Sequence, residues 1–237
     1  MIPIFSSHYS IGKSILTLEH PDKNPQGARS VFSIAKENNL KKIVLVENCL
    51  TGFPQALKMS EEMGIQLCFG LQINVCEQGH KVIVFALNSK GCQKLNQIYS
   101  EAFSKNKECA SLDEIKKHWS EDLSLAIPFY DSFIYKNTMT FDNCTPDFKK
   151  IKPTFFIESN GLPFDQLIKN KVEKYCKLYN LQSEEVKSIY YENKDDAESL
   201  QAYKCITSRR FGKSSLTKPN LDHFGSNEFC AESYLQS

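Results

Sequence analysis

The stretch Lys42 to Glu47, KIVLVE, followed by Phe53 to Met63, FPQALKMSEEM, decides the fold class of this chain. The first segment is a continuous run of β-branched residues and leucine bounded by charge, which is typical of a strand buried on both faces. The second predicts a helix, because Pro54 stands near its start, where a missing N–H costs nothing, and Gly64 follows as a C-cap. Together they predict a complete β-α unit.

Short apolar runs alternate with helix-period segments on both sides of this unit, which predicts an α/β fold around a largely parallel sheet. Two apolar runs, 66–76 and 81–88, are joined by the polar residues 77–80, and this arrangement predicts an antiparallel hairpin. Residues 130–152 lack clear periodicity, so we expect an irregular connection there. The other expected elements are strands at 3–7, 123–128, 154–158 and 186–191, and helices at 28–39, 89–103, 112–119, 164–179 and 195–209.

Length and composition favour one domain over residues 1–237, with a core of about 2–210 and a loop-rich tail at 211–237. Hydrophobic residues make up 41% and charged residues 24%, so a packed core is expected. The net charge is only +1, which gives none of the basic excess that drives binding to phosphate backbones. Direct nucleic-acid binding is therefore not indicated. A local group is better interpreted as a solvated helix end: Lys204, Arg209, Arg210 and Lys213.

Cysteine usage points to a reducing, cytoplasmic setting. The nine cysteines are scattered and include no C-x-x-C pair, so neither a disulfide framework nor a zinc-finger spacing is present. The N-terminus lacks a basic region followed by a long apolar run, and no segment approaches the roughly 20 apolar residues that span a bilayer. We therefore expect no export and no membrane partner.

Candidate chemistry is sparse when the residues are taken alone. Gly12-Lys13-Ser14 has the last three letters of a P-loop, but the upstream glycine is missing. None of the five histidines is spaced closely to another, and a lone histidine such as His8 is more often structural than a ligand. Glu47 and Glu158 end two predicted strands, where they could hold one hard cation weakly. Pairing with a nearby cation or backbone N–H is the favoured interpretation of each.

Several segments, taken in order, resemble the PHP (polymerase and histidinol phosphatase) domain of bacterial DNA polymerase III alpha subunits. The strongest match is Asp196-Ala197-Glu198 followed by Tyr203-Lys204-Cys205-Ile206, after a strand ending in Ile189-Tyr190-Tyr191. The similarity runs over about residues 1–234, and its weight comes from collinearity. Further matching segments are Tyr9-Ser10, Ile65 to Val75, Asn88 to Leu95 and Phe155 to Gly161. The resemblance implies a distorted (β/α)7-type PHP barrel.

The resemblance also implies a metal site that this chain has lost. Active relatives hold metal ions with His, Asp, Glu and Cys ligands at strand ends, and neutral amides and hydroxyls are poor replacements for them. Those positions fall here on Ile4 and Ser6, Glu47 and Asn48, Gln72, Glu158 and Asn160, and Ser188 and Tyr190, with His8 as another candidate in the first motif. We therefore expect a vestigial cleft with no catalytic residue and no cofactor, or at most one weakly held divalent ion.

Three functions follow from this resemblance. The first is a non-catalytic scaffold in DNA replication, with a polymerase or a proofreading exonuclease subunit as partner. The second is a metal-dependent phosphoesterase or 3′→5′ exonuclease with a site remodelled around His8, Glu47 and Glu158. The third is a free-standing protein, such as a virus or plasmid carries, that binds an unrelated host factor. No polymerase active site fits within 237 residues, so we expect either an isolated domain of a longer polymerase or a free-standing PHP-like protein.

Overall fold

Seven strands close into a barrel in the computed structural model, which describes residues 1–20, 22, 27–75, 79–104, 109–141, 143–148, 151–207 and 225–236. The sheet order is β2-β1-β8-β7-β6-β4-β3, and pairing of β2 with β3 closes the ring. Its strands are β1 (Ile2–Phe5), β2 (Lys42–Glu47), β3 (Gln66–Val75), β4 (Lys81–Ala86), β6 (Leu123–Ile127), β7 (Thr154–Ile157) and β8 (Gln182–Ile189). A short further strand, β5 (Cys109–Ala110), pairs with the end of β3. The predicted distorted seven-stranded α/β barrel is confirmed.

The barrel is distorted because one strand runs against the others. β4 pairs antiparallel with both β3 and β6, and the other barrel pairings are parallel. The predicted hairpin between β3 and β4 is thereby confirmed. Within it Gly70 lies opposite Phe85, and a Cβ on Gly70 would stand 2.6 Å from the Phe85 ring. Glycine is required there because the Phe85 ring fills the space that a side chain would need.

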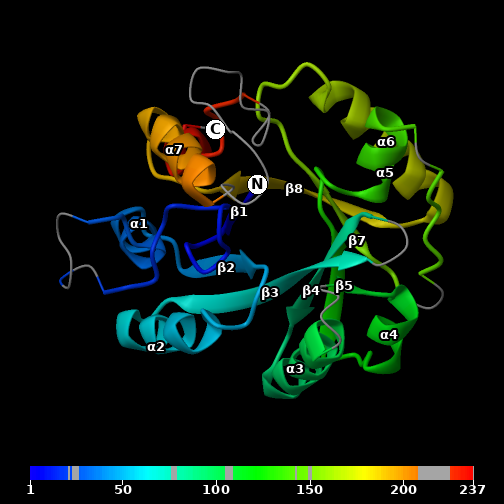
Figure 1. The fold of residues 1–237 in the computed structure, drawn as a ribbon, viewed down its shortest axis with the longest axis horizontal. Helices are drawn as coiled ribbons and strands as arrows, with labels where there is room; N and C mark the ends of the chain where they lie inside the picture. The colour runs from blue at the N-terminus through cyan, green and yellow to red at the C-terminus, as the bar shows by residue number, and fades with distance from the viewer. Residues whose placement is uncertain are drawn as a thin grey trace.

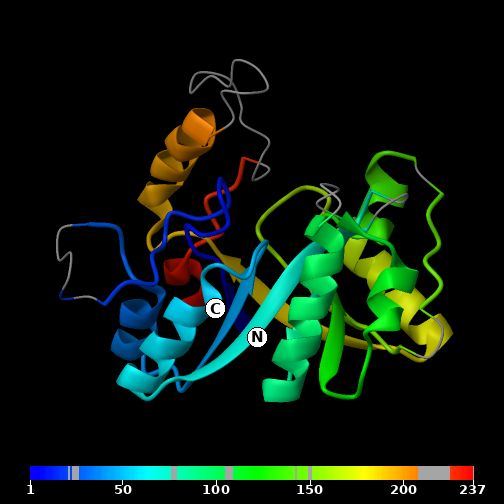
Figure 2. The same cartoon turned by 60° about the horizontal axis from the view of Figure 1, so that its bottom comes forward.

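Helices surround the barrel on the outside, as Figures 1 and 2 show. Their apolar faces and the outer face of the sheet share one large buried cluster. A second, smaller cluster fills the barrel interior, and it consists of Ile4, Val44, Val46, Ile83, Phe85, Ala126, Phe156 and Val186. The helices are α1 (Val31–Glu37), α2 (Phe53–Met63), α3 (Ser89–Ser104), α4 (Leu112–Lys117), α5 (Phe133–Met139), α6 (Asp165–Tyr179), α7 (Ala197–Thr207) and α8 (Ala231–Leu235), with a 3₁₀ turn at Lys194–Asp196.

The β-α unit from which the fold was predicted is confirmed to the residue. β2 and α2 have the expected bounds, and Gly64 ends α2 in the left-handed conformation with φ of 66°. β8 begins at Gln182, four residues before the predicted start, because its first half is exposed and polar and lacks the apolar signal of a buried strand. That half nevertheless pairs with β7.

The prediction of an irregular connection over 130–152 is wrong for residues 133–139, which form α5. Ser132 begins this helix, and its side chain accepts a hydrogen bond from the N–H of Tyr135. The helix has only seven residues, and their mixture of aromatic and polar types gives too short a window for a helical period. Tertiary packing of Phe133 and Ile134 stabilises what the local pattern did not indicate.

The chain's end is partly described. Within the predicted loop-rich tail, Cys230 makes a β-bridge with Tyr191 and the helix α8 follows it. Arg209, Arg210 and Lys213 lie outside the described residues, as do residues 211–224 of the tail. Seven of the described cysteines are free and Cys109 is disulfide-bonded, which the scattered spacing did not predict. None of the described helices has both the length and the apolar character that crossing a bilayer requires.

Candidate functional site

The barrel is polar at one end because the inward-facing side chains change character as the strands finish. Inward positions alternate along a strand with a period of two. Ile4 and Phe156 belong to the interior cluster and form the apolar bottom of an open cavity of about 440 Å³, and Ser6 and Glu158, two residues further on, are polar side chains that line the same cavity. Five more described polar side chains from the same strand ends line this cavity, which we call the cleft: Asn48, Gln72, Lys81, Ser188 and Tyr190.

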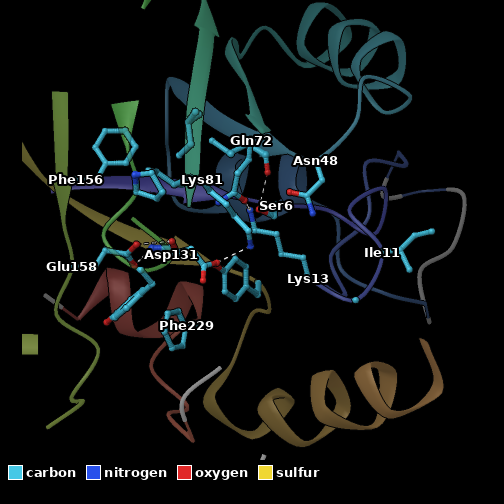
Figure 3. A pocket seen from close by; sticks show the side chains of 18 of the residues that line it. Ser6, Ile11, Lys13, Asn48, Gln72, Lys81, Asp131, Phe156, Glu158 and Phe229 are labelled. Atoms are coloured by element: carbon cyan, nitrogen blue, oxygen red, sulfur yellow. Dashed lines mark hydrogen bonds and ion pairs between the residues drawn. The ribbon is translucent and has the colours of Figure 1, made fainter. Parts of the chain in front are cut away.

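Lys13 brings a positive charge into the cleft from the loop after β1 (Figure 3). Its Nζ donates a hydrogen bond to Oε1 of Gln72 at 2.7 Å and lies 5.9 Å from the centre of the Tyr190 ring. Burial lowers the pKa of Lys13 to about 8, and the negative charges of Glu47 and Glu158 oppose part of that effect. The side chain remains mostly protonated near neutral pH.

Glu158 follows β7 and is held by donors from two neighbouring segments. Its Oε1 accepts from the Ser188 hydroxyl at 2.9 Å, and its Oε2 accepts from the Ser188 backbone N–H and from Nδ2 of Asn160, each at 3.1 Å. Burial raises the pKa of Glu158, and these hydrogen bonds together with the charge of Lys187 act in the opposite direction. The carboxylate therefore has protein donors on both oxygens.

Asn160 connects Glu158 to a second buried carboxylate. Its Nδ2 lies 3.1 Å from the hydroxyl of Tyr130, which donates to Oδ1 of Asp165 at 2.9 Å. Oδ2 of Asp165 accepts from the backbone N–H groups of Asn160 and Leu162 at 2.8 and 3.0 Å. The loop after β7 is thereby fixed by hydrogen bonds made within the protein.

Glu47 lies at the same end of the barrel but does not line the cleft. It is fully buried, and Oε1 accepts from the backbone N–H of Ser7 at 2.8 Å while Oε2 accepts from the hydroxyl of Ser10. That hydroxyl in turn accepts from the N–H of Asn48 at 2.9 Å. Burial raises the pKa of Glu47, and the serine hydrogen bonds and Lys13 partly offset it.

A second lysine of the cleft is paired. Nζ of Lys81 lies 2.7 Å from Oδ2 of Asp131, and the backbone carbonyl of Asp131 accepts from the N–H of Lys81 at 2.9 Å. Asp131 has a φ of 64°, a conformation that aspartate tolerates better than most residues. This ion pair forms the wall of the cleft between β4 and the segment after β6 (Figure 3).

Most residues that the sequence singled out lie around this cleft. Ser6, Asn48, Gln72, Glu158, Ser188 and Tyr190 line it, whereas Glu47 and Asn160 are buried beside it. His8 does not belong to the group. It is exposed, lies in a separate cavity of about 270 Å³ with His20, and has Nδ1 3.3 Å from the carbonyl of Leu16. His8 thus supplies no group to a site built on Glu158.

Sequence reasoning missed Lys13, Lys81, Asp131 and Tyr130. Lys13 was considered only as part of an incomplete P-loop, and its partner Gln72 is 59 residues away. Asp131 and Tyr130 follow the predicted strand 123–128 closely, and this position at a strand end was an available signal. Lys81 stands at the start of its strand, but β4 is antiparallel, so the start of this strand lies at the same barrel end as the ends of the others.

The residues around the cleft do not fit a multinuclear metal centre. In the described part of the chain, no three His, Cys, Asp or Glu side chains lie close enough together to hold a metal ion. Both oxygens of Glu158 already accept hydrogen bonds, and a lysine amine stands where further cations would be repelled. Divalent ions need several anionic or nitrogen ligands converging on one point, and this arrangement does not supply them.

The chain matches no protein-family model and no curated protein. Among solved structures it is similar to a candidate metal-dependent phosphoesterase from Bifidobacterium adolescentis, at 9% identity and a TM-score of 0.46, over 78% of this chain and 86% of that one. It is also similar to a two-domain protein from Bacteroides vulgatus containing a predicted PHP-like metal-dependent phosphoesterase, at 12% identity and a TM-score of 0.46, over 77% of this chain and 49% of that one. An amidohydrolase from Chromobacterium violaceum gives 11% identity and a TM-score of 0.46, over 85% of this chain and 96% of that one. At this level of similarity the neighbours do not decide a function.

Proposed function

We propose that this chain is a non-catalytic PHP-like module, related to the DNA polymerase III alpha subunit, that acts as a scaffold or protein-binding domain in DNA replication. The collinear sequence motifs support the relationship, and the closed seven-stranded barrel is the fold that this relationship requires. A fold does not by itself imply a function, so the proposal depends on the side chains at the barrel mouth.

The observation that carries the proposal is the position of Lys13. Its amine lies in the cleft, bonded to Gln72, and the charges of Glu47 and Glu158 both act on it. A metal centre would supply positive charge to these carboxylates, and here lysines supply it from within the chain: Lys13 acts on both, and Lys187 also acts on Glu158. The positive charge of Lys13 would repel a divalent ion brought into the same space. Lys13 therefore offsets part of the charge of these carboxylates without a metal.

The serines around the two carboxylates support the same conclusion. Glu47 is held by Ser7 and Ser10, and Glu158 is held by Ser188 and Asn160. Donors of this kind satisfy the hydrogen-bonding capacity of a carboxylate, but they do not activate a water molecule. In metal-dependent hydrolysis the metal ion supplies that activation. We expect no resident cofactor, and at most one divalent ion held weakly with most of its waters.

The proposed partners are replication proteins, such as a polymerase subunit or a proofreading exonuclease. Affinity capture tests this: the tagged chain is immobilised, incubated with extract of the source cell, and the retained proteins are identified by mass spectrometry. We expect a polymerase or exonuclease subunit to be enriched over a tag-only control. Each retained subunit is then purified and mixed with the chain, and co-elution in size-exclusion chromatography is the second expected result.

Two outcomes would contradict the proposal. Enrichment of an unrelated host protein, with no replication subunit above the control, would favour a free-standing binding protein. Metal-dependent hydrolysis of a phosphate ester by the purified chain would favour the phosphoesterase alternative. These two results differ in kind, so a single preparation distinguishes them.

A further inference from the structure

The amine of Lys13 can make more interactions than the one it makes with Gln72. Within the described residues its amine makes one hydrogen bond, to Gln72, and it takes part in no ion pair. An ammonium group has three N–H bonds, so Gln72 satisfies one of them. The nitrogen opens onto a cavity of about 440 Å³, which lies within the size range of small-molecule sites. An amine in such a place is accessible to a ligand of metabolite size.

The amine is also more reactive than an ordinary lysine. Burial lowers the pKa of Lys13 to about 8. At about pH 7.5 roughly a quarter of such groups carry a free electron pair, against about one in a thousand for an exposed lysine with its usual pKa. Desolvated lysines of this kind are the ones that react with carbonyl groups in proteins.

The charge of the cleft selects the ligand class. Lys13, Lys81 and Lys204 line it together with Glu158 and with Asp131, which is paired with Lys81. Aromatic surface from Tyr190 and Phe229, which stack at 5.5 Å, forms another part of the wall. A small molecule with an anionic group and a flat or apolar body is complementary to this lining.

We propose that Lys13 is a covalent attachment site for a small aldehyde or ketone carrying an anionic group, which it binds as an imine. The nitrogen electron pair forms a bond to the carbonyl carbon, giving a carbinolamine. The carbonyl oxygen then leaves as water, taking both hydrogens of the neutral amine, and the carbon-nitrogen double bond forms. Protonation of the imine from solvent restores the positive charge between Glu47 and Glu158, so the electrostatics of the cleft are preserved. This activity is independent of the proposed role in replication.

Reductive trapping tests the proposal. The full chain is incubated at about pH 7.5 with substoichiometric pyridoxal 5′-phosphate, an anionic aldehyde, and the imine is reduced with borohydride. Peptide mapping then gives the extent of labelling at each lysine. We expect Lys13 to be labelled at least about tenfold faster than exposed lysines, because far more of its amine is neutral. Pyridoxal, which lacks the phosphate, should label Lys13 several-fold more slowly.

Two variants serve as controls. Lys13→Arg keeps the charge but removes the reactive amine, and it should abolish the fast phase of labelling. Lys90→Arg, at an exposed lysine on α3, should leave the fast phase unchanged. Circular dichroism and thermal unfolding confirm that both variants are folded. Labelling spread over exposed lysines in proportion to their exposure would overturn the proposal, as would a fast phase that persists in Lys13→Arg. Equal rates with pyridoxal and its phosphate would overturn the anionic requirement.

Discussion

The same strands form the interior cluster of the barrel, here called the floor, and the polar end that carries the cleft, here called the mouth. Side chains only two residues apart belong to these two regions, yet they differ completely in character. Along β7 and the residue that follows it the change is from Phe156 to Glu158, and on β8 it is from Val186 to Ser188. Side chains of the floor contact each other without polar partners. At the mouth, Glu158 is hydrogen-bonded across the gap between β7 and β8. Apolar packing therefore stabilises the floor, whereas hydrogen bonds and charge interactions stabilise the mouth.

This difference separates what the fold needs from what its chemistry needs. Hydrophobic side chains of similar volume can replace one another in a floor of this kind at modest cost. At the mouth each group depends on a particular partner, as Lys13 does on Gln72. A chain can therefore keep its barrel while the residues at the mouth are replaced one by one.

The largest expected effect comes from truncating the floor. Phe156→Ala should lower the free energy of unfolding by about 3–5 kcal/mol, because it leaves a cavity in the barrel interior where Phe156 packs 6.3 Å from the Phe85 ring. Urea denaturation followed by circular dichroism measures this. The matched change at the mouth, Ser6→Ala, removes a hydrogen bond to the carbonyl of Val46 and should cost about 1 kcal/mol. Equal losses in the two variants would contradict the distinction between floor and mouth.

The next effect concerns Glu158 and pH. Burial raises its pKa in the folded protein, so the folded state binds more protons than the unfolded state above the ordinary value of 4.5. Its contribution to stability is therefore present below pH 4.5 and is lost as pH rises through the folded pKa. Glu158→Gln cannot titrate, and in that window its stability relative to the wild type should rise by at most about 1.4 kcal/mol per pH unit. Parallel stability curves for the two proteins would contradict this.

Glu158→Gln should also lower the free energy of unfolding by about 1–3 kcal/mol at every pH. The reason is that Gln places an NH₂ group against a donor of Ser188 or Asn160. Glu47→Gln is the matched control, since burial raises the pKa of Glu47 as well. Thermal unfolding across the pH range, repeated for both variants, separates the slope from the offset.

Lys13 should give the smallest effect on stability, and that effect should change with pH in the direction opposite to the effect of Glu158. Its pKa is lowered from 10.5 to about 8, so between those values the unfolded state binds more protons than the folded state. Stability should therefore increase as pH rises from about 8 to 10.5. The gain should be smaller than the limit of about 3 kcal/mol that the full shift sets, because the side chain is partly exposed and solvent screens it. Lys13→Met should lack this gain, and a gain that persists in the variant would mean that another group titrates there.

The sequence predicted the floor better than the mouth because the two depend on signals of different range. β2 and α2 carry their signals within six and eleven residues, whereas Ser6, Asn48 and Gln72 were placed at one barrel end only through the resemblance to the PHP domain. The contact between Lys13 and Gln72 spans 59 residues and leaves no local pattern. His8 was separated from the cleft by a turn of the following loop, in which its N–H donates to the carbonyl of Leu16. Neither the contact between Lys13 and Gln72 nor the position of His8 can be deduced from the spacing of residues in the sequence.

On our proposal Lys13 and its neighbours stand in place of a metal centre, and the metal content of the purified chain tests this claim. The purified chain is dialysed against Zn²⁺ and Mn²⁺, separated from free ions and subjected to elemental analysis. Hydrolysis of nitrophenyl phosphate and of single-stranded DNA is measured on the same samples in added Mn²⁺. We predict less than about 0.1 metal ion per chain and no hydrolysis above background, because the described residues give the cleft no converging ligand set. Two or more tightly bound ions per chain, or hydrolysis that Glu47→Ala abolishes, would contradict the claim.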